Sequence, residues 1–138
     1  MSHDNTTIIL VTHENIGTAL LTVLRNTLEN IPLPIITINA ASKSTPEELT
    51  AQLQNTLHQL SPQQNVLILT DLFGSTPCNV LRKLKTKHPL RIVTGLNMPM
   101  LIRTVNYADL PLDELAQKAQ SGGKDGVVQC SIMEGATV

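Results

Sequence analysis

The sequence VLILTDLFGSTPCN, residues Val66–Asn79, joins a short apolar run to a polar turn and then to a helical pattern. An apolar run of this length between turn residues is typical of a buried strand in a parallel sheet. We predict that Asp71 stands just past this strand, with Thr76 as the N-cap of the next helix and Pro77 at its first position. Because ligands of open α/β sheets bind beyond the carboxyl ends of the strands, and helix starts attract anions, the stretch predicts a place for phosphate chemistry.

Strand and helix patterns alternate on both sides of this stretch. Right-handed βαβ crossovers are expected from such an order. We therefore predict an α/β fold, an open and mostly parallel twisted sheet of about five strands with helices on both faces. The predicted strands cover residues 7–11, 35–38, 66–69, 90–95 and 127–132. One predicted helix begins at Gly17 and another near Pro46. Three more are predicted at about 77–87, after Met100 and near 112–120.

The last predicted strand differs from the others in how it is reached. Residues 121–126 read SGGKDG and predict a flexible link rather than a helix end. The strand over 127–132 is therefore expected to be antiparallel and at the sheet edge, where it is a candidate for exchange between two protomers. We expect residues 1–138 to form a single domain with its core at about 7–132.

The composition excludes several classes of protein. A net charge of −1 and a single Phe and Tyr leave neither a basic surface nor stacking platforms for nucleic acid. No apolar segment approaches the roughly 20 residues that span a bilayer, and residues 1–6 lack the apolar core of a signal peptide. Cys78 and Cys130 form no metal motif and no disulfide framework. We expect a soluble cytoplasmic domain.

His13 is the foremost candidate for chemistry. It follows the first strand and so falls at the same sheet edge as Asp71, if both strands are parallel. A carboxylate that holds one ring nitrogen leaves the other free for base, nucleophilic or metal-ligand work. A loop histidine without function is the alternative. For His3, His58 and His88 that alternative is favoured, and their spacing supports no metal site.

Asp71 has two further readings. It can accept a hydrogen bond from a backbone N–H in its own turn. It can also be a phosphoacceptor, as in receiver domains, but the required acidic pair after the first strand is reduced to Glu14. The residues Thr76, Asn79, Met98 and Pro99 likewise have capping or packing as their plain alternative.

Three segments together resemble a known family. They are Thr12-His13, Thr70–Asn79 and Gly95–Leu101, and they resemble the IIA component of the mannose-type phosphoenolpyruvate-dependent sugar phosphotransferase system. The Asp-x-x-Gly-x-(Ser/Thr)-Pro-x-Asn and Asn-x-Pro-Met-Leu patterns carry the resemblance with the N-terminal His. It covers about residues 7–132.

This resemblance implies a cytoplasmic phosphocarrier that needs no metal and no cofactor. His13 would accept a phosphoryl group from phospho-HPr and pass it to a IIB component, so that membrane association is only indirect, through permease partners. Asp71 would orient the ring with Nε2 as the nucleophile, and Thr76 would contact the phosphoryl oxygens. A homodimer that exchanges the last strand is implied as well. The residues expected to line the phosphate and partner site are Thr12, Phe73, Gly74, Ser75, Asn79, Asn97, Met98 and Pro99.

The residue after the histidine departs from the family pattern. The family commonly has glycine there, whereas this chain has Glu14. A carboxylate beside a phosphohistidine adds like-charge repulsion and changes the turn. The departure bears on partner choice and on the lifetime of the phosphohistidine.

Three functions remain open at the level of sequence. The first is a transport phosphocarrier for a sugar that the sequence does not name. The second is a regulatory phosphocarrier that signals to a protein without a permease. The third is a small-ligand-binding α/β module with an inert His13.

Overall fold

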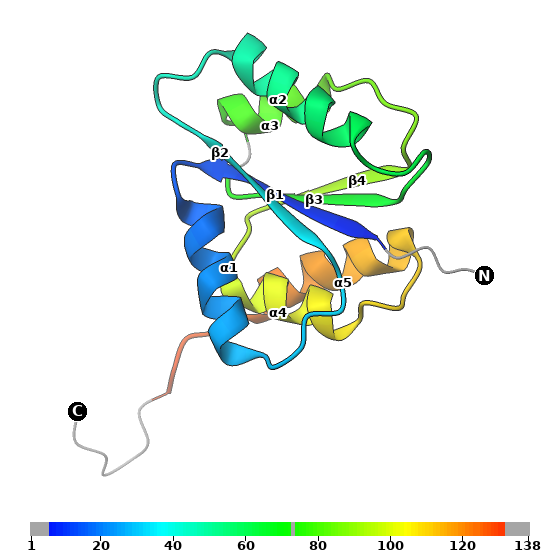
Figure 1. Cartoon of the computed structure of the whole chain (residues 1–138). Helices are drawn as coiled ribbons and strands as arrows, with labels where there is room; N and C mark the ends of the chain where they lie inside the picture. The colour runs from blue at the N-terminus through cyan, green and yellow to red at the C-terminus, as the bar shows by residue number, and fades with distance from the viewer. Residues whose placement is uncertain (1–5, 73, 132–138) are drawn as a thin grey trace.

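The computed structural model describes residues 6–72 and 74–131, which form an α/β fold with one parallel sheet of four strands and five helices (Figure 1). The strands are β1 (Thr7–His13), β2 (Ile35–Ala40), β3 (Val66–Thr70) and β4 (Leu90–Thr94), and their order in the sheet is β2-β1-β3-β4. The helices are α1 (Ile16–Thr27), α2 (Pro46–His58), α3 (Thr76–Arg82), α4 (Met98–Asn106) and α5 (Leu112–Asp125). In these described parts of the chain no helix has both the length and the apolar character needed to cross a membrane.

The sheet separates two hydrophobic cores. Helices α2 and α3 cover one face, and α1, α4 and α5 cover the other (Figure 1). Side chains of β1 and β3 alternate between the two cores, so that all five residues of β3 and the first six of β1 are buried. The continuous apolar runs that predicted buried strands are therefore confirmed, because strands covered on both faces need no polar side.

Helix α2 begins where the sequence placed it. Thr45 is its N-cap and forms a capping box with Glu48: the Thr45 hydroxyl accepts from the Glu48 N–H at 3.1 Å, and the Glu48 carboxylate accepts from the Thr45 N–H at 3.2 Å. Pro46 lies in the first turn. Such reciprocal capping satisfies two N–H groups that the helix itself cannot.

Helix α3 differs from its prediction at both ends. Its N-cap is Ser75 rather than Thr76, since Ser75 is extended and its carbonyl already accepts the Asn79 N–H at 2.8 Å. Pro77 is thus the second helical residue. The helix ends at Arg82 instead of about residue 87. The sequence beyond it is rich in basic residues, which cannot stabilise further turns by forming ion pairs with one another.

Helix α5 shows the largest departure. The predicted flexible link over residues 121–126 is wrong, because α5 continues to Asp125 with Gly126 as its C-cap. Glycine permits close contact with α4: a Cβ on Gly122 would lie 2.7 Å from the Cβ of Arg103, and one on Gly126 would overlap the Cβ of Pro99. Tertiary packing against α4 thus outweighs the low helix propensity of glycine.

The predicted fifth strand is absent from the described chain. Residues 127–131 belong to no strand and leave the body from the end of α5 (Figure 1), and Ile132 lies outside the described residues. Within residues 6–72 and 74–131, the sheet therefore has four parallel strands instead of about five, and no antiparallel edge strand is present there.

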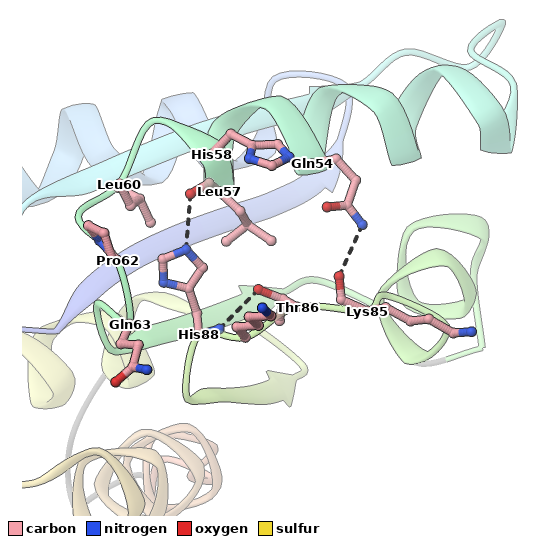
Figure 2. Close-up of a pocket in the computed structure, with 10 residues that line it drawn as sticks. Gln54, Leu57, His58, Leu60, Pro62, Gln63, Lys85, Thr86 and His88 are labelled. Atoms are coloured by element: carbon pink, nitrogen blue, oxygen red, sulfur yellow. Dashed lines mark hydrogen bonds between the residues drawn. The ribbon is translucent and has the colours of Figure 1, made fainter.

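His88 joins three segments at the amino-terminal edge of the sheet. Its Nδ1 lies 3.0 Å from the carbonyl oxygen of Gln64, before β3, and its Nε2 lies 3.0 Å from the carbonyl oxygen of Leu57, near the end of α2 (Figure 2). Carbonyl oxygens only accept, so a ring that carries both protons donates to both, whereas a neutral ring donates to one.

Replacing His88 by alanine should lower the free energy of unfolding by about 1–3 kcal/mol, since the neutral ring donates to one of the two partly buried carbonyls and the variant removes that hydrogen bond. Urea unfolding measures the loss. His58→Ala is the matched control, because His58 is exposed nearby and its change should stay within about 0.5 kcal/mol. Equal stability of the two variants would show that the carbonyl contacts of His88 do not hold these segments together.

Candidate functional site

The strand order places a topological switch point between β1 and β3. The chain moves from β1 outward to β2 on one side, and then returns to build β3 and β4 on the other. The connections beyond the carboxyl ends of β1 and β3 therefore diverge, which is where open α/β sheets bind their ligands. His13 is the last residue of β1, and Asp71 follows the last residue of β3.

Parallel pairing brings these two residues together across 58 positions of sequence. The register pairs Val11 of β1 with Thr70 of β3, so that both strands end at the same edge. The Nδ1 atom of His13 lies 3.0 Å and 3.1 Å from the two carboxylate oxygens of Asp71. The backbone N–H of His13 also donates to Asp71, at 3.1 Å. Asp71 therefore holds both the ring and the main chain of His13.

The geometry fixes which ring nitrogen is free. A carboxylate only accepts hydrogen bonds, so Nδ1 of His13 carries the proton and donates it to Asp71. Nε2 then has a lone pair in the neutral ring. The His13 side chain is 38% exposed and that of Asp71 is 11% exposed. A sheltered carboxylate thus orients a ring that is partly exposed to solvent.

Thr12 supports the turn after His13 from below. Its side chain is fully buried, and its hydroxyl accepts a hydrogen bond from the Gly17 N–H at 2.8 Å. This contact replaces a cap at the start of α1, where Asn15 provides no side-chain bond. A Cβ on Gly17 would lie 3.1 Å from the Thr12 hydroxyl, which explains the glycine. Thr12 thus acts beneath the site, and we do not place it among the residues that meet a ligand.

Glu14 has a left-handed backbone conformation, with φ of 45°. Its N–H donates to the Ala40 carbonyl at the end of β2, at 3.0 Å. Its carboxylate accepts the Ser42 N–H at 2.8 Å. The residue that departs from the family pattern therefore binds the loop between β2 and α2. The sequence signal for this was the missing glycine, whose backbone role Glu14 takes over.

The turn between β3 and α3 presents the polar residues of the central stretch. Gly74 has φ of 81°, a conformation that glycine adopts at little cost. The Ser75 hydroxyl donates to the Leu72 carbonyl at 2.8 Å and so closes the turn. Thr76 and Asn79 are exposed at the start of α3. The predicted lining residue Phe73 lies outside the described residues.

The predicted segment after β4 reaches the same edge of the sheet. Asn97 is the N-cap of α4 and accepts from the Met100 N–H at 2.9 Å, while its amide donates to the Gly123 carbonyl of α5 at 3.2 Å. Met98 and Pro99 are partly buried. These residues therefore fix the loop against α5, and their role at the His13 site stays a prediction.

Two exposed apolar side chains lie next in sequence to the His13–Asp71 pair, and the sequence pattern did not single them out. Ile16 starts α1 just after His13 and is 44% exposed, and Leu72 follows Asp71 and is 57% exposed. Single exposed aliphatic side chains are normal on a protein surface, so these two carry no assignment by themselves. Nothing in their local pattern separates them from core residues.

The opposite edge of the sheet holds a separate hollow of about 770 Å³ between the end of α2 and the segment before β4 (Figure 2). Its walls include His58 and His88, which therefore lie far from His13 along the strands.

His3 lies outside the described residues. Within residues 6–72 and 74–131, no three His, Cys, Asp or Glu side chains gather in a way that could hold a metal ion. Cys78 is buried and Cys130 is exposed, and both are free.

Comparison with known sequences identifies relatives of this chain. A family model described as "PTS system fructose IIA component" matches residues 7–120. The mannose-specific EIIAB component of the phosphotransferase system from Escherichia coli K12 is 31% identical over 84 residues, which are 59% of this chain. The match spans only 26% of that longer protein.

Solved structures show the same fold over nearly the whole chain. The mannose/sorbose-specific IIA subunit from Enterococcus faecalis superposes with a TM-score of 0.81 at 25% identity, covering 94% of this chain and 97% of the other. The EIIA component from Streptococcus agalactiae gives 0.78 at 26% identity, covering 90% and 96%. With the site at the switch point and the family match over residues 7–120, this chain belongs to the mannose/fructose-type IIA components of the sugar phosphotransferase system.

Proposed function

We propose that the chain is a phosphocarrier for sugar uptake. His13 accepts a phosphoryl group from phospho-HPr and passes it to a IIB component, which serves a sugar permease in the membrane. One observation carries the proposal: Nδ1 of His13 is held by Asp71 at 3.0 Å, so that Nε2 is left as the free nucleophile. Family membership supports a phosphotransferase-system component of this kind.

The reaction exchanges one nitrogen–phosphorus bond for another. The Nε2 lone pair of His13 attacks the phosphorus, the bond to the donor's histidine breaks, and that nitrogen leaves with the bonding electrons. The Nδ1 proton stays in its hydrogen bond with Asp71. The His13 ring becomes cationic as the new bond forms, and the adjacent carboxylate stabilises this positive charge. Transfer to the acceptor reverses each step.

Phosphoryl transfer passes through a loose transition state with charge on the phosphoryl oxygens, so a protein contributes mainly positions and hydrogen-bond donors. We assign Thr76 to this contact. It is exposed at the start of α3, and among the described residues its hydroxyl has no hydrogen-bond partner. Gly74, Ser75 and Asn79 shape the same turn. Helix α3 has seven residues, so its dipole adds little, and the hydroxyl is the principal donor.

Incubation with phosphoenolpyruvate, enzyme I and HPr should add one acid-labile phosphoryl group to the protein. His13→Ala should add none, because the acceptor atom is gone. Intact-mass spectrometry measures both. His58→Ala is the control and should gain the group as the native chain does. A native chain that stays unmodified with active upstream proteins would contradict the phosphocarrier function.

Asp71→Ala should slow phosphorylation by about 10- to 100-fold without abolishing it. The expected loss corresponds to one hydrogen bond to a charged group, about 1.5–3 kcal/mol. Rapid-quench measurement of phosphoprotein formation gives the rate. Asp109→Ala removes an exposed carboxylate elsewhere and should transfer at the native rate. An Asp71→Ala variant with full activity would refute the orienting role of this residue.

We also propose a homodimer in which residues after α5 pair with the partner protomer. Val127 and Val128 are 78% and 72% exposed and belong to no strand, which leaves apolar, β-branched residues for such pairing. The chain has a mass of 15.0 kDa, and light scattering should give twice this value. Removal of residues 127–138 should yield the monomer. A full-length protein that remains a monomer at all concentrations would contradict the exchange.

A further inference from the structure

Glu14 occupies a backbone conformation that costs free energy, so some interaction must hold it there. Its φ of 45° lies in the left-handed region, where a residue with a Cβ is strained and glycine is not. The position directly follows His13. A contact that glycine cannot make would offset the cost of a glutamate at this point.

That side chain binds the loop of residues 41–44, between β2 and α2. The Glu14 carboxylate accepts the Ser42 N–H at 2.8 Å, and the Glu14 N–H donates to the Ala40 carbonyl at 3.0 Å. In the described ranges its carboxylate is not hydrogen-bonded to His13. The negative charge is thus engaged by the neighbouring loop.

The loop that Glu14 holds lies at the rim of the His13 site. His13 pairs with Ala40 in the β1–β2 register, so the loop starts directly after the residue that lies opposite His13. The loop turns on a hydrogen bond from the Ser44 N–H to the Ala41 carbonyl at 2.9 Å and then enters the capped α2. Its residues Ala41, Ser42 and Lys43 are exposed. Any protein that reaches His13 from the β2 side meets this loop.

We infer that Glu14 is a positioning residue that ties loop 41–44 to the phosphoacceptor turn, and that this loop forms part of the docking surface for phospho-HPr. The tie between Glu14 and the loop stands independently, whereas the docking role of the loop rests on the proposed function. The hydrogen bond to Ser42 acts on the free protein, before any partner binds. Because the loop is already held in one conformation, less conformational entropy is lost when the donor protein binds. The hydrogen bond should therefore lower the KM for the donor protein.

Glu14→Gly removes the carboxylate but keeps the backbone conformation and the N–H that donates to Ala40. Glycine adopts φ of 45° without strain, so the variant relieves the backbone strain as well. Glu14→Gln keeps an acceptor oxygen without the charge. Glu29→Gln is the matched control, since Glu29 is exposed beyond the end of α1, at the opposite edge of the sheet from His13.

Two measurements test the inference. Amide hydrogen exchange at Ser42 should be about tenfold faster in Glu14→Gly, intermediate in Glu14→Gln, and unchanged in Glu29→Gln. Steady-state phosphorylation should show a KM for phospho-HPr about fivefold to tenfold higher in Glu14→Gly, with kcat near the native value, because the reacting atoms of His13 and Asp71 are untouched.

Each failure has its own meaning. Unchanged exchange at Ser42 in Glu14→Gly would overturn the tie between the two loops. Faster exchange with an unchanged KM would overturn the docking role of the loop. A native protein that takes no phosphoryl group would overturn the proposed function and the docking role together, and exchange at Ser42 would still decide the tie.

Discussion

The parallel register between β1 and β3 is the constraint on which the site depends. Val11 lies opposite Thr70, so that His13 and Asp71 emerge side by side from strands that are far apart in sequence. A parallel strand that slipped by one residue would turn its buried side chains to the opposite face. Such a slip is opposed by both cores, because Ile8 and Leu10 pack on one side of β1 and Ile9 and Val11 on the other. The packing of the apolar interior thus keeps His13 and Asp71 next to each other at the edge of the sheet.

Short polar contacts beyond the strand ends convert this edge into a defined surface. Thr12 holds the start of α1 from beneath, Glu14 holds the loop after β2, and Asn97 holds the loop after β4 against α5. Each contact satisfies a backbone group at a chain reversal, where regular structure provides no partner. Three segments beyond the carboxyl ends of the strands are therefore each tied to the body of the domain by a side-chain hydrogen bond.

Sequence patterns anticipated the strands, the order of the elements and the pairing of His13 with Asp71, since these follow from apolar runs, turn residues and the geometry of parallel sheets. They misplaced the end of the chain. Gly122 and Gly126 predict a break by local propensity, yet in the structure they are the positions at which α5 approaches α4 closely enough to contact Arg103 and Pro99. Residues 127–131 follow that helix out of the body, so the β pattern of their sequence finds no strand to pair with in this chain. Thr76 was assigned the N-cap position that belongs to Ser75, where the extended backbone and the carbonyl that accepts from the Asn79 N–H mark the helix start, without a side-chain cap.

By itself, the sequence determined the fold class, the buried strands and the residues able to carry chemistry, because these depend on the polarity and covalent type of neighbouring side chains. The tertiary structure decided where the Glu14 carboxylate goes and how α5 ends, and it supplied the contact with Asp71 that leaves Nε2 of His13 free. The Nδ1 proton is set by an aspartate 58 residues away, and the Glu14 carboxylate by an amide 28 residues away. The helix end is set by the shape of α4. Each of these depends on a contact between distant segments, and the free energy of such a contact exists only once the sheet has brought them together.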